Sequence, residues 1–184
     1  MNTRELFAHL FGAEGCSIIT EYIIRKCFNG MNFIDIRNWL EQNGYDRHTT
    51  IELKSTEILI MTPDGIMMQM RTADKGKLGA FGGVLNDGED PRDGAVRELK
   101  EETGLDVQLL DLQYVGYNQH EHVYTNGDKA LFHTYRYVLR LKEVPFMILN
   151  DEANGVEFVT AVVPNIIENQ QEFVGDALSG KFEK

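Results

Sequence analysis

The stretch EDPRDGAVRELKEETGL, residues 89–105, constrains the fold of this 184-residue chain more than any other. Asp90 is a residue type that caps the N-terminus of a helix, and Pro91 suits the first helical position. Gly104 is typical of the left-handed residue that ends a helix. The sequence therefore predicts a helix of about three and a half turns between these signals. Its apolar positions, Ala95, Val96 and Leu99, predict a face that packs on a core.

Three carboxylates, those of Glu98, Glu101 and Glu102, fall on one face of this helix about 100° wide. Like charges three and four residues apart destabilise a helix, and anions near its C-terminus oppose the helix dipole. Local stability therefore does not explain their placement. A divalent cation does, because Mg²⁺ and Mn²⁺ prefer several carboxylate oxygens as ligands. The helix alone leaves a solvated acidic face open as the alternative.

The wider pattern resembles the signature of the Nudix hydrolase family, G-x5-E-x7-R-E-U-x-E-E-x-G-U, in which U is a bulky aliphatic residue. Gly83 stands at the first glycine, Glu89 at the first glutamate and Arg97 at the arginine. Every specified position matches, up to Leu105. One neighbouring position departs from the family, whose members often have a proline where this chain has Phe81.

The resemblance implies a metal-dependent site. Glu98, Glu101 and Glu102 would bind Mg²⁺ or Mn²⁺, and a backbone carbonyl of Gly82 or Gly83 would be a further ligand. Hard oxygen donors of this kind match the ligand preference of both ions.

The resemblance also implies roles for an arginine and a general base. Arg97 would orient the site and pair with Glu89. In the family the base is either a glutamate of the signature, here Glu98, or an acidic residue of a later loop. Asp151 and Glu152 are the candidates in that loop, which precedes a strand pattern and contains a glycine. A plain surface turn is the alternative for this loop.

The fold implied by the resemblance is an α/β class structure, a Nudix α/β/α sandwich with a mixed sheet. The flanking sequence fits, because alternating apolar residues and turn signals surround the acidic helix. We expect strands within residues 49–62, 66–73, 106–119, 133–143 and 155–164, turns at 63–65 and 125–128, and a closing helix at 165–178.

Residues 1–45 read as a small helical N-terminal extension, which leaves residues 46–184 as the Nudix domain. Apolar residues recur at three- and four-residue spacing in this extension, as in amphipathic helices. We expect these helices to pack against the domain or across a homodimer. Cys16 and Cys27 lie here, and we expect both to be reduced and buried.

The composition of the chain disfavours two classes of partner, polymeric nucleic acid and membranes. A formal net charge of −11 disfavours a broad surface for polymeric nucleic acid. No segment reaches the roughly 18 apolar residues of a membrane span, and the N-terminus lacks a signal-peptide core. We therefore expect no membrane partner and a cytoplasmic location.

The implied activity is hydrolysis of a nucleoside diphosphate linked to another moiety, such as ADP-ribose, a nucleotide sugar or a modified nucleotide. A nucleotide-sensing module on the same fold is the alternative, with the N-terminal helices as its partner interface. The three intact glutamates favour the enzyme. Arg71, Lys75 and Lys77 are candidates for phosphate contacts, or are ordinary solvated charges of a loop.

A second segment, residues 117–135, is rich in aromatic and imidazole side chains. Its members could stack on a base, and two of its histidines could act as a metal pair. A plain surface loop is the competing interpretation. The residues concerned are Tyr117, His120, His122, Tyr124 and His133.

Overall fold

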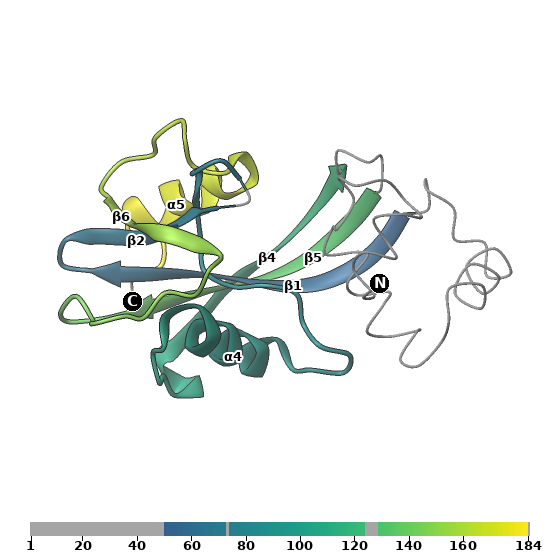
Figure 1. Cartoon of the computed structure of the whole chain (residues 1–184), viewed down its shortest axis with the longest axis horizontal. Coiled ribbons are helices and arrows are strands. Elements are labelled where there is room, and N and C mark those ends of the chain that lie inside the picture. The colour runs from purple at the N-terminus through teal and green to yellow at the C-terminus, as the bar shows by residue number, and fades with distance from the viewer. Residues whose placement is uncertain (1–49, 73, 124–128, 184) are drawn as a thin grey trace, which may run out of the picture. The chain divides into compact units, whose positions relative to one another are not determined.

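The computed structural model shown in Figure 1 describes residues 50–72, 74–123 and 129–183. The expected N-terminal helices, the domain boundary at residue 45, both cysteines and the turn at 125–128 lie outside the described residues. The chain divides into two compact units, residues 1–53 with 119–132 and residues 54–118 with 133–184. In the described part of the first unit, the ring of His120 stacks on Phe132 with centroids 5.2 Å apart. The candidate site described below lies in the second unit.

Within the described residues, six strands form one sheet. Its order is β3-β2-β1-β5-β4, and β6 pairs with β2. The strands confirm the expected strand segments and add β3, which is too short to show a period in the sequence. Their bounds are β1 Thr50–Thr62, β2 Gly65–Arg71, β3 Leu78–Gly79, β4 Leu112–Val123, β5 Lys129–Arg140 and β6 Ala153–Val159.

The sheet is mixed, as expected. β1 and β2 are antiparallel across the predicted turn, with Met61 opposite Ile66. β1 and β5 run in the same direction, because their cross-strand contacts advance together along both strands. Ser55 Oγ lies 2.9 Å from Thr134 Oγ1. Two residues further on, Arg136 Nε donates to Glu57 Oε2 at 2.9 Å.

Two α-helices cover opposite faces of this sheet (Figure 1). The helix α4, Pro91–Thr103, packs on the face that carries Ile58 and Ile60. The helix α5, Gln171–Leu178, packs on the face that carries Leu59 and Val138. Alternate residues of each strand thus feed two separate cores, which gives the α/β/α layers that the resemblance implied. No helix among the described residues is long and apolar enough to cross a membrane.

Three segments differ from expectation at their ends. The segment expected to be a strand from residue 106 first forms the 3-10 helix Leu109–Asp111. A tight reciprocal turn causes this, because Gln108 N donates to the Asp111 carboxylate at 2.9 Å and Asp111 N donates to Gln108 O at 3.0 Å. The last strand ends at Val159, before the expected residue 164. The closing helix starts as a 3-10 turn, Glu168–Gln170, and becomes α-helical only at Gln171.

Candidate active site

The acidic helix α4 has the bounds that its sequence predicts. The Asp90 side chain accepts a hydrogen bond from Arg92 N at 2.8 Å, and Pro91 is the first helical residue. Gly104 adopts a left-handed conformation and donates its N–H to Lys100 O at 3.0 Å. Leu99 is fully buried in the core below the sheet. This packing fixes the rotation of the helix, so the face with the three glutamates turns toward the loop that follows β3.

Arg97 forms the ion pair with Glu89 that the resemblance implied. Its Nε and Nη2 donate to the two oxygens of Glu89 at 2.8 and 2.9 Å. Nη1 donates to Glu98 at 2.6 Å and to Glu101 at 3.3 Å. Nη2 also donates to the Val84 carbonyl at 3.3 Å. A guanidinium has five N–H groups, so all of its donors are engaged.

These contacts shift the ionisation of both partners. The hydrogen bonds from Arg97 lower the pKa of Glu89 to about 2, against a smaller opposing effect of burial. The Glu89 carboxylate in turn raises the pKa of Arg97. Burial raises the pKa of Glu98, although Arg97 opposes this. Arg97 and Glu89 therefore stay charged together throughout the physiological range.

Glu102 is the most deeply buried of the three glutamates on the acidic face of α4, with 2% of its surface exposed. Its Oε2 accepts a hydrogen bond from Gly82 N at 2.7 Å, and its Oε1 accepts one from Gln69 Nε2 at 3.1 Å. None of the described basic side chains forms an ion pair with it. Burial raises the pKa of Glu102 to about 7, despite both hydrogen bonds. The fold thus buries this carboxylate and supplies only neutral donors to it.

Gln69 is a site residue that sequence reasoning missed. It is fully buried in β2, and its Nε2 donates to Ala80 O at 3.0 Å as well as to Glu102. Its Oε1 has no hydrogen-bond partner among the described residues. The sequence does contain a signal for it, because Gln69 is a polar residue inside the apolar strand sequence IMMQMR. A polar side chain buried in such a strand needs hydrogen-bond partners, which points to a role for this residue.

The glycine pair before α4 is required by close approach. Gly82 has φ 122°, and a Cβ there would collide with the Thr56 carbonyl. A Cβ on Gly83 would lie 2.8 Å from the carboxyl carbon of Glu98. The two carbonyls differ, because Gly83 O accepts a hydrogen bond from Thr56 N at 2.9 Å, whereas Gly82 O accepts none from any described residue. Of the two expected carbonyl ligands, that of Gly82 is therefore the one that the described residues leave with a free oxygen for a metal ion.

The loop before β6 comes to the same site. Thr72 N, at the end of β2, donates to Glu152 O at 2.9 Å. The negative charge of Glu152 is one of the smaller causes that raise the pKa of Glu98, after burial. The Thr72 hydroxyl donates to Asp151 O at 3.4 Å. The structure thus brings the loop that carries both candidates to the end of the acidic helix, where Asn150 N donates to Glu102 O at 3.4 Å.

In the structure Glu98 and Glu101 share Arg97, while Glu102 bonds to Gly82 and Gln69. Accordingly, no three carboxylate, imidazole or thiolate groups gather as a metal cluster among the described residues. The donor set still fits a hard divalent ion, because it offers carboxylate oxygens on one helix face, including a buried carboxylate that forms no ion pair with a described side chain.

The aromatic segment is not joined to this site by any described contact. The Tyr117 hydroxyl hydrogen-bonds to His133 Nδ1, and the Tyr117 ring also packs edge-on against Tyr135 at 5.6 Å. Tyr124 lies outside the described residues. A base-stacking role for this segment stays a prediction.

The sequence model of the family described as "NUDIX domain" matches residues 53–171, more than half of the chain. The chain belongs to the NUDIX family. Residues 83–105 are its NUDIX box, and α4 is the helix of that box.

Known proteins similar to this chain include other NUDIX members. It is 40% identical over 57 residues to the oxidized purine nucleoside triphosphate hydrolase of Mus musculus, which covers 30% of this chain and 36% of that protein. A MutT protein from Methanosarcina mazei Go1 aligns with TM-score 0.54 and 17% identity over 73% of this chain and 98% of its own.

A third similar protein is a bifunctional NMN adenylyltransferase/ADP ribose pyrophosphatase from Francisella tularensis. It aligns with TM-score 0.55 and 16% identity, over 88% of this chain and 52% of its own. At these identities the two solved structures establish the NUDIX fold. This chain spans about a third of the mouse protein and about half of the bifunctional one.

Proposed function

We propose that this NUDIX protein is a divalent-metal-dependent pyrophosphohydrolase. The observation that carries the proposal is the setting of Glu102. It is 2% exposed, it has no ion-pair partner among the described residues, and it shares a face of α4 with Glu98 and Glu101. A buried carboxylate without a cation is costly for a fold. Its retention is explained if a cation binds there during function.

The residues that would hold Mg²⁺ or Mn²⁺ are Glu98, Glu101, Glu102 and the carbonyl of Gly82, or alternatively that of Gly83. When bound, such an ion neutralises phosphate charge and polarises a phosphoryl oxygen. Arg97 positions Glu98 and Glu101 by donating to both from one nitrogen. Glu89 in turn holds Arg97 by a bidentate pair, which fixes the plane of the guanidinium.

The substrate class that we propose is a nucleoside diphosphate linked to another moiety. Similar proteins support this choice. The mouse relative is named for hydrolysis of oxidized purine nucleoside triphosphates, and the Francisella structure contains AMP and a manganese ion. ADP-ribose, nucleotide sugars and modified nucleotides are therefore the first compounds to test.

A phosphate-release screen tests this function directly. The purified chain is incubated with ADP-ribose, nucleotide sugars, dinucleoside polyphosphates and oxidized nucleotides, with Mg²⁺ or Mn²⁺ and with chelator. We expect turnover of at least one compound, and its loss in chelator. Full activity in chelator would contradict the metal requirement. Tight binding of a nucleotide without turnover would instead support a nucleotide-sensing module.

We further propose that Glu152 is the general base. Its backbone is anchored to the end of β2, and its charge acts on Glu98. A base must reach the attacking water directly or through one intermediary, and an exposed loop carboxylate next to the box can do so.

The test is a pair of matched variants in one loop. Glu152→Gln should reduce kcat by roughly 10²-fold or more with little change in the Mg²⁺ dependence. Asp151→Asn, on the neighbouring exposed residue, should leave kcat near the wild-type value. Glu98→Gln should weaken metal binding as well as kcat. If both loop variants retain wild-type kcat, Glu98 becomes the better candidate for the base.

A further inference from the structure

The charge balance of the site raises a question about the substrate. A pyrophosphate brings several negative charges to a site that already contains the carboxyl groups of Glu98, Glu101, Glu102 and Glu152. Arg97 cannot contact it directly in this arrangement, because all five of its N–H groups are engaged by protein oxygens. A guanidinium that contacts the phosphate directly must therefore come from elsewhere in the chain.

Arg71 is the last residue of β2, and it lies on the same face of the strand as Gln69, two residues earlier. Its side chain crosses Gly79 of β3, where a Cβ would lie 2.6 Å from Arg71 Cδ. Gly79 is the cross-strand partner of Gln69, whose amide holds Glu102. The arm of Arg71 therefore crosses β3 on the side of the sheet where the Gln69 amide donates to Glu102.

One hydrogen bond orients the guanidinium of Arg71, and its terminal N–H groups remain available to a ligand. Its Nε donates to Asp74 Oδ2 at 2.8 Å, which fixes the direction of the group. The two terminal nitrogens, with four N–H groups, donate to none of the described residues. The side chain is 23% exposed, so a ligand can reach it. A planar fork with free parallel donors matches two oxygens of a phosphate.

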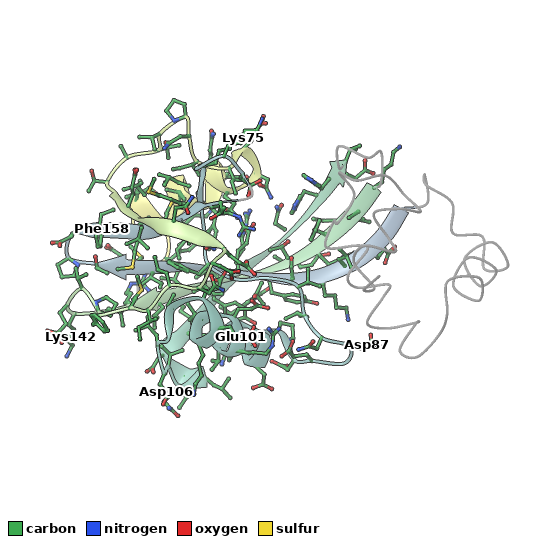
Figure 2. All side chains as sticks on the ribbon, in the orientation of Figure 1. Lys75, Asp87, Glu101, Asp106, Lys142 and Phe158 are labelled. Carbon is green, nitrogen blue, oxygen red and sulfur yellow. The ribbon has the colours of Figure 1, made fainter. Side chains whose placement is uncertain are left out.

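Other basic side chains of the second unit are less suitable. Lys75 and Lys77 are exposed, and Figure 2 shows Lys75 at the outer edge of its loop, away from Glu101 on α4. Arg136 lies on the face covered by α5, where it bonds to Glu57 and to Asn169 O. Arg71 therefore combines proximity to the box with free donors.

We propose that the guanidinium of Arg71 binds a phosphate group of the substrate beside Glu102, and that Gly79 is glycine to leave room for this arm. The inference rests on the proposed pyrophosphohydrolase function, because it assigns one contact of that substrate. Asp74 positions Arg71 and does not itself touch the ligand.

Binding of imidodiphosphate, a pyrophosphate analogue that resists hydrolysis, tests the assignment. Its Kd is measured by titration calorimetry in Mg²⁺. We expect Arg71→Ala to weaken binding by about tenfold to a hundredfold, as for loss of a charge-assisted bidentate contact. Arg71→Lys should recover only part of the loss, since an ammonium cannot offer two parallel donors. Lys75→Ala, in the loop between β2 and β3, should bind like wild type.

Gly79→Ala provides a test that leaves all charges in place. The added methyl group would displace the flexible arm of Arg71, so we expect about a tenfold loss of imidodiphosphate affinity in the wild-type background. In the Arg71→Ala background the same change should have no further effect. A purely structural role of Gly79 would give additive losses. Thermal unfolding of each variant establishes that it is folded.

Two results would overturn the assignment. One is an Arg71→Ala protein that binds imidodiphosphate within about twofold of wild type. The other is an equal loss of affinity for Mg²⁺ alone, which would show that Arg71 acts only by shaping the metal site. A wild-type protein that binds Mg²⁺ and imidodiphosphate but hydrolyses nothing in the substrate screen would contradict the proposed enzyme, while the Arg71 comparison would still be decided by binding.

Discussion

Two buried glutamates lie on opposite faces of the same sheet and have opposite surroundings. Glu57, on the α5 face, is 7% exposed and accepts hydrogen bonds from Arg136 Nε and Gln170 Nε2, both at 2.9 Å. Glu102, on the α4 face, is 2% exposed and accepts hydrogen bonds only from a backbone amide and the Gln69 side chain. The first forms an ion pair with a guanidinium of the fold, and the second forms none with any described side chain.

The contrast separates a structural carboxylate from a functional one. A buried ion pair with satisfied hydrogen bonds is self-contained, so the α5 face needs no ligand. A buried carboxylate that meets only neutral donors keeps part of its desolvation cost until a cation arrives. Burial alone does not distinguish Glu57 from Glu102, whereas the identity of the donors around each does.

The largest expected effect is on the α5 face. Glu57→Leu leaves Arg136 buried without its carboxylate, so we expect the free energy of unfolding to fall by about 3–5 kcal/mol. Arg136→Met should cost a similar amount, because it leaves Glu57 unpaired. The double variant should recover most of the loss. Urea unfolding measures all three, and single variants within about 1 kcal/mol of wild type would show that the pair is not structural.

The next effect is the pH dependence of stability in metal-free protein. Glu102 has a folded pKa of about 7 against 4.5 for an ordinary glutamate. Below pH 4.5 both states are protonated there, so this group imposes no penalty. As the pH rises from 4.5 to 7 the unfolded state ionises first, so stability should fall by about 3 kcal/mol.

Excess Mg²⁺ should restore this loss at pH 8 and have little effect at pH 5, because the ion binds the ionised carboxylate. Thermal unfolding with and without Mg²⁺ at several pH values measures the difference. Glu89 acts in the opposite sense, since its pKa of about 2 makes it stabilising above pH 4.5 and less so as the pH falls toward 2. A Mg²⁺ effect that is equal at pH 5 and pH 8 would remove Glu102 from the metal site.

A third prediction concerns turnover. Glu102→Gln should lower kcat by roughly 10²-fold, which corresponds to about 2.7 kcal/mol, while the protein remains folded. The double variant at Glu57 and Arg136 should keep kcat within about tenfold of wild type, since it changes the other face. The measurement is steady-state kinetics on the compound found in the screen. Equal losses of kcat in the two proteins would contradict the assignment of a functional role to Glu102 and a structural role to Glu57.

The smallest effect is expected at Gln69. Gln69→Leu removes the donor to Glu102 Oε1, so we expect about a tenfold loss of Mg²⁺ affinity, as for other residues that hold a metal ligand in place. Gln113→Leu is the matched control, because Gln113 donates to Phe182 O at 3.2 Å on an outer strand. Calorimetric titration of Mg²⁺ compares the two. Unchanged affinity in Gln69→Leu would contradict a positioning role.

The sequence predicts those parts of the molecule whose signals are local. The bounds of α4 follow from its caps, and the shared face of its glutamates follows from helix geometry. The resemblance to the NUDIX box predicts the ion pair between Arg97 and Glu89. In these cases partners are separated by at most one helix and the loop before it.

The remaining contacts join residues far apart in the chain. Gln69 meets Glu102 across 33 positions, and Gln170 meets Glu57 across 113. Neither pair leaves a periodic pattern, because each depends on how strands and helices are stacked. The two-residue strand β3 is likewise defined only by its pairing with β2. These features were therefore beyond sequence reasoning, including the position of Arg71 over Gly79.

The backbone at Ala80 is held from both faces of the sheet. Its N–H donates to Gln170 Oε1 at 2.8 Å, while its carbonyl accepts from Gln69 Nε2 at 3.0 Å. Exchange of this amide hydrogen with deuterated solvent requires the contact with Gln170 to open. Fraying of an end or a loop does not achieve this, so the amide should exchange at the slow rate set by global unfolding. The backbone at Ala80, just before the glycine pair, would then open as rarely as the core itself.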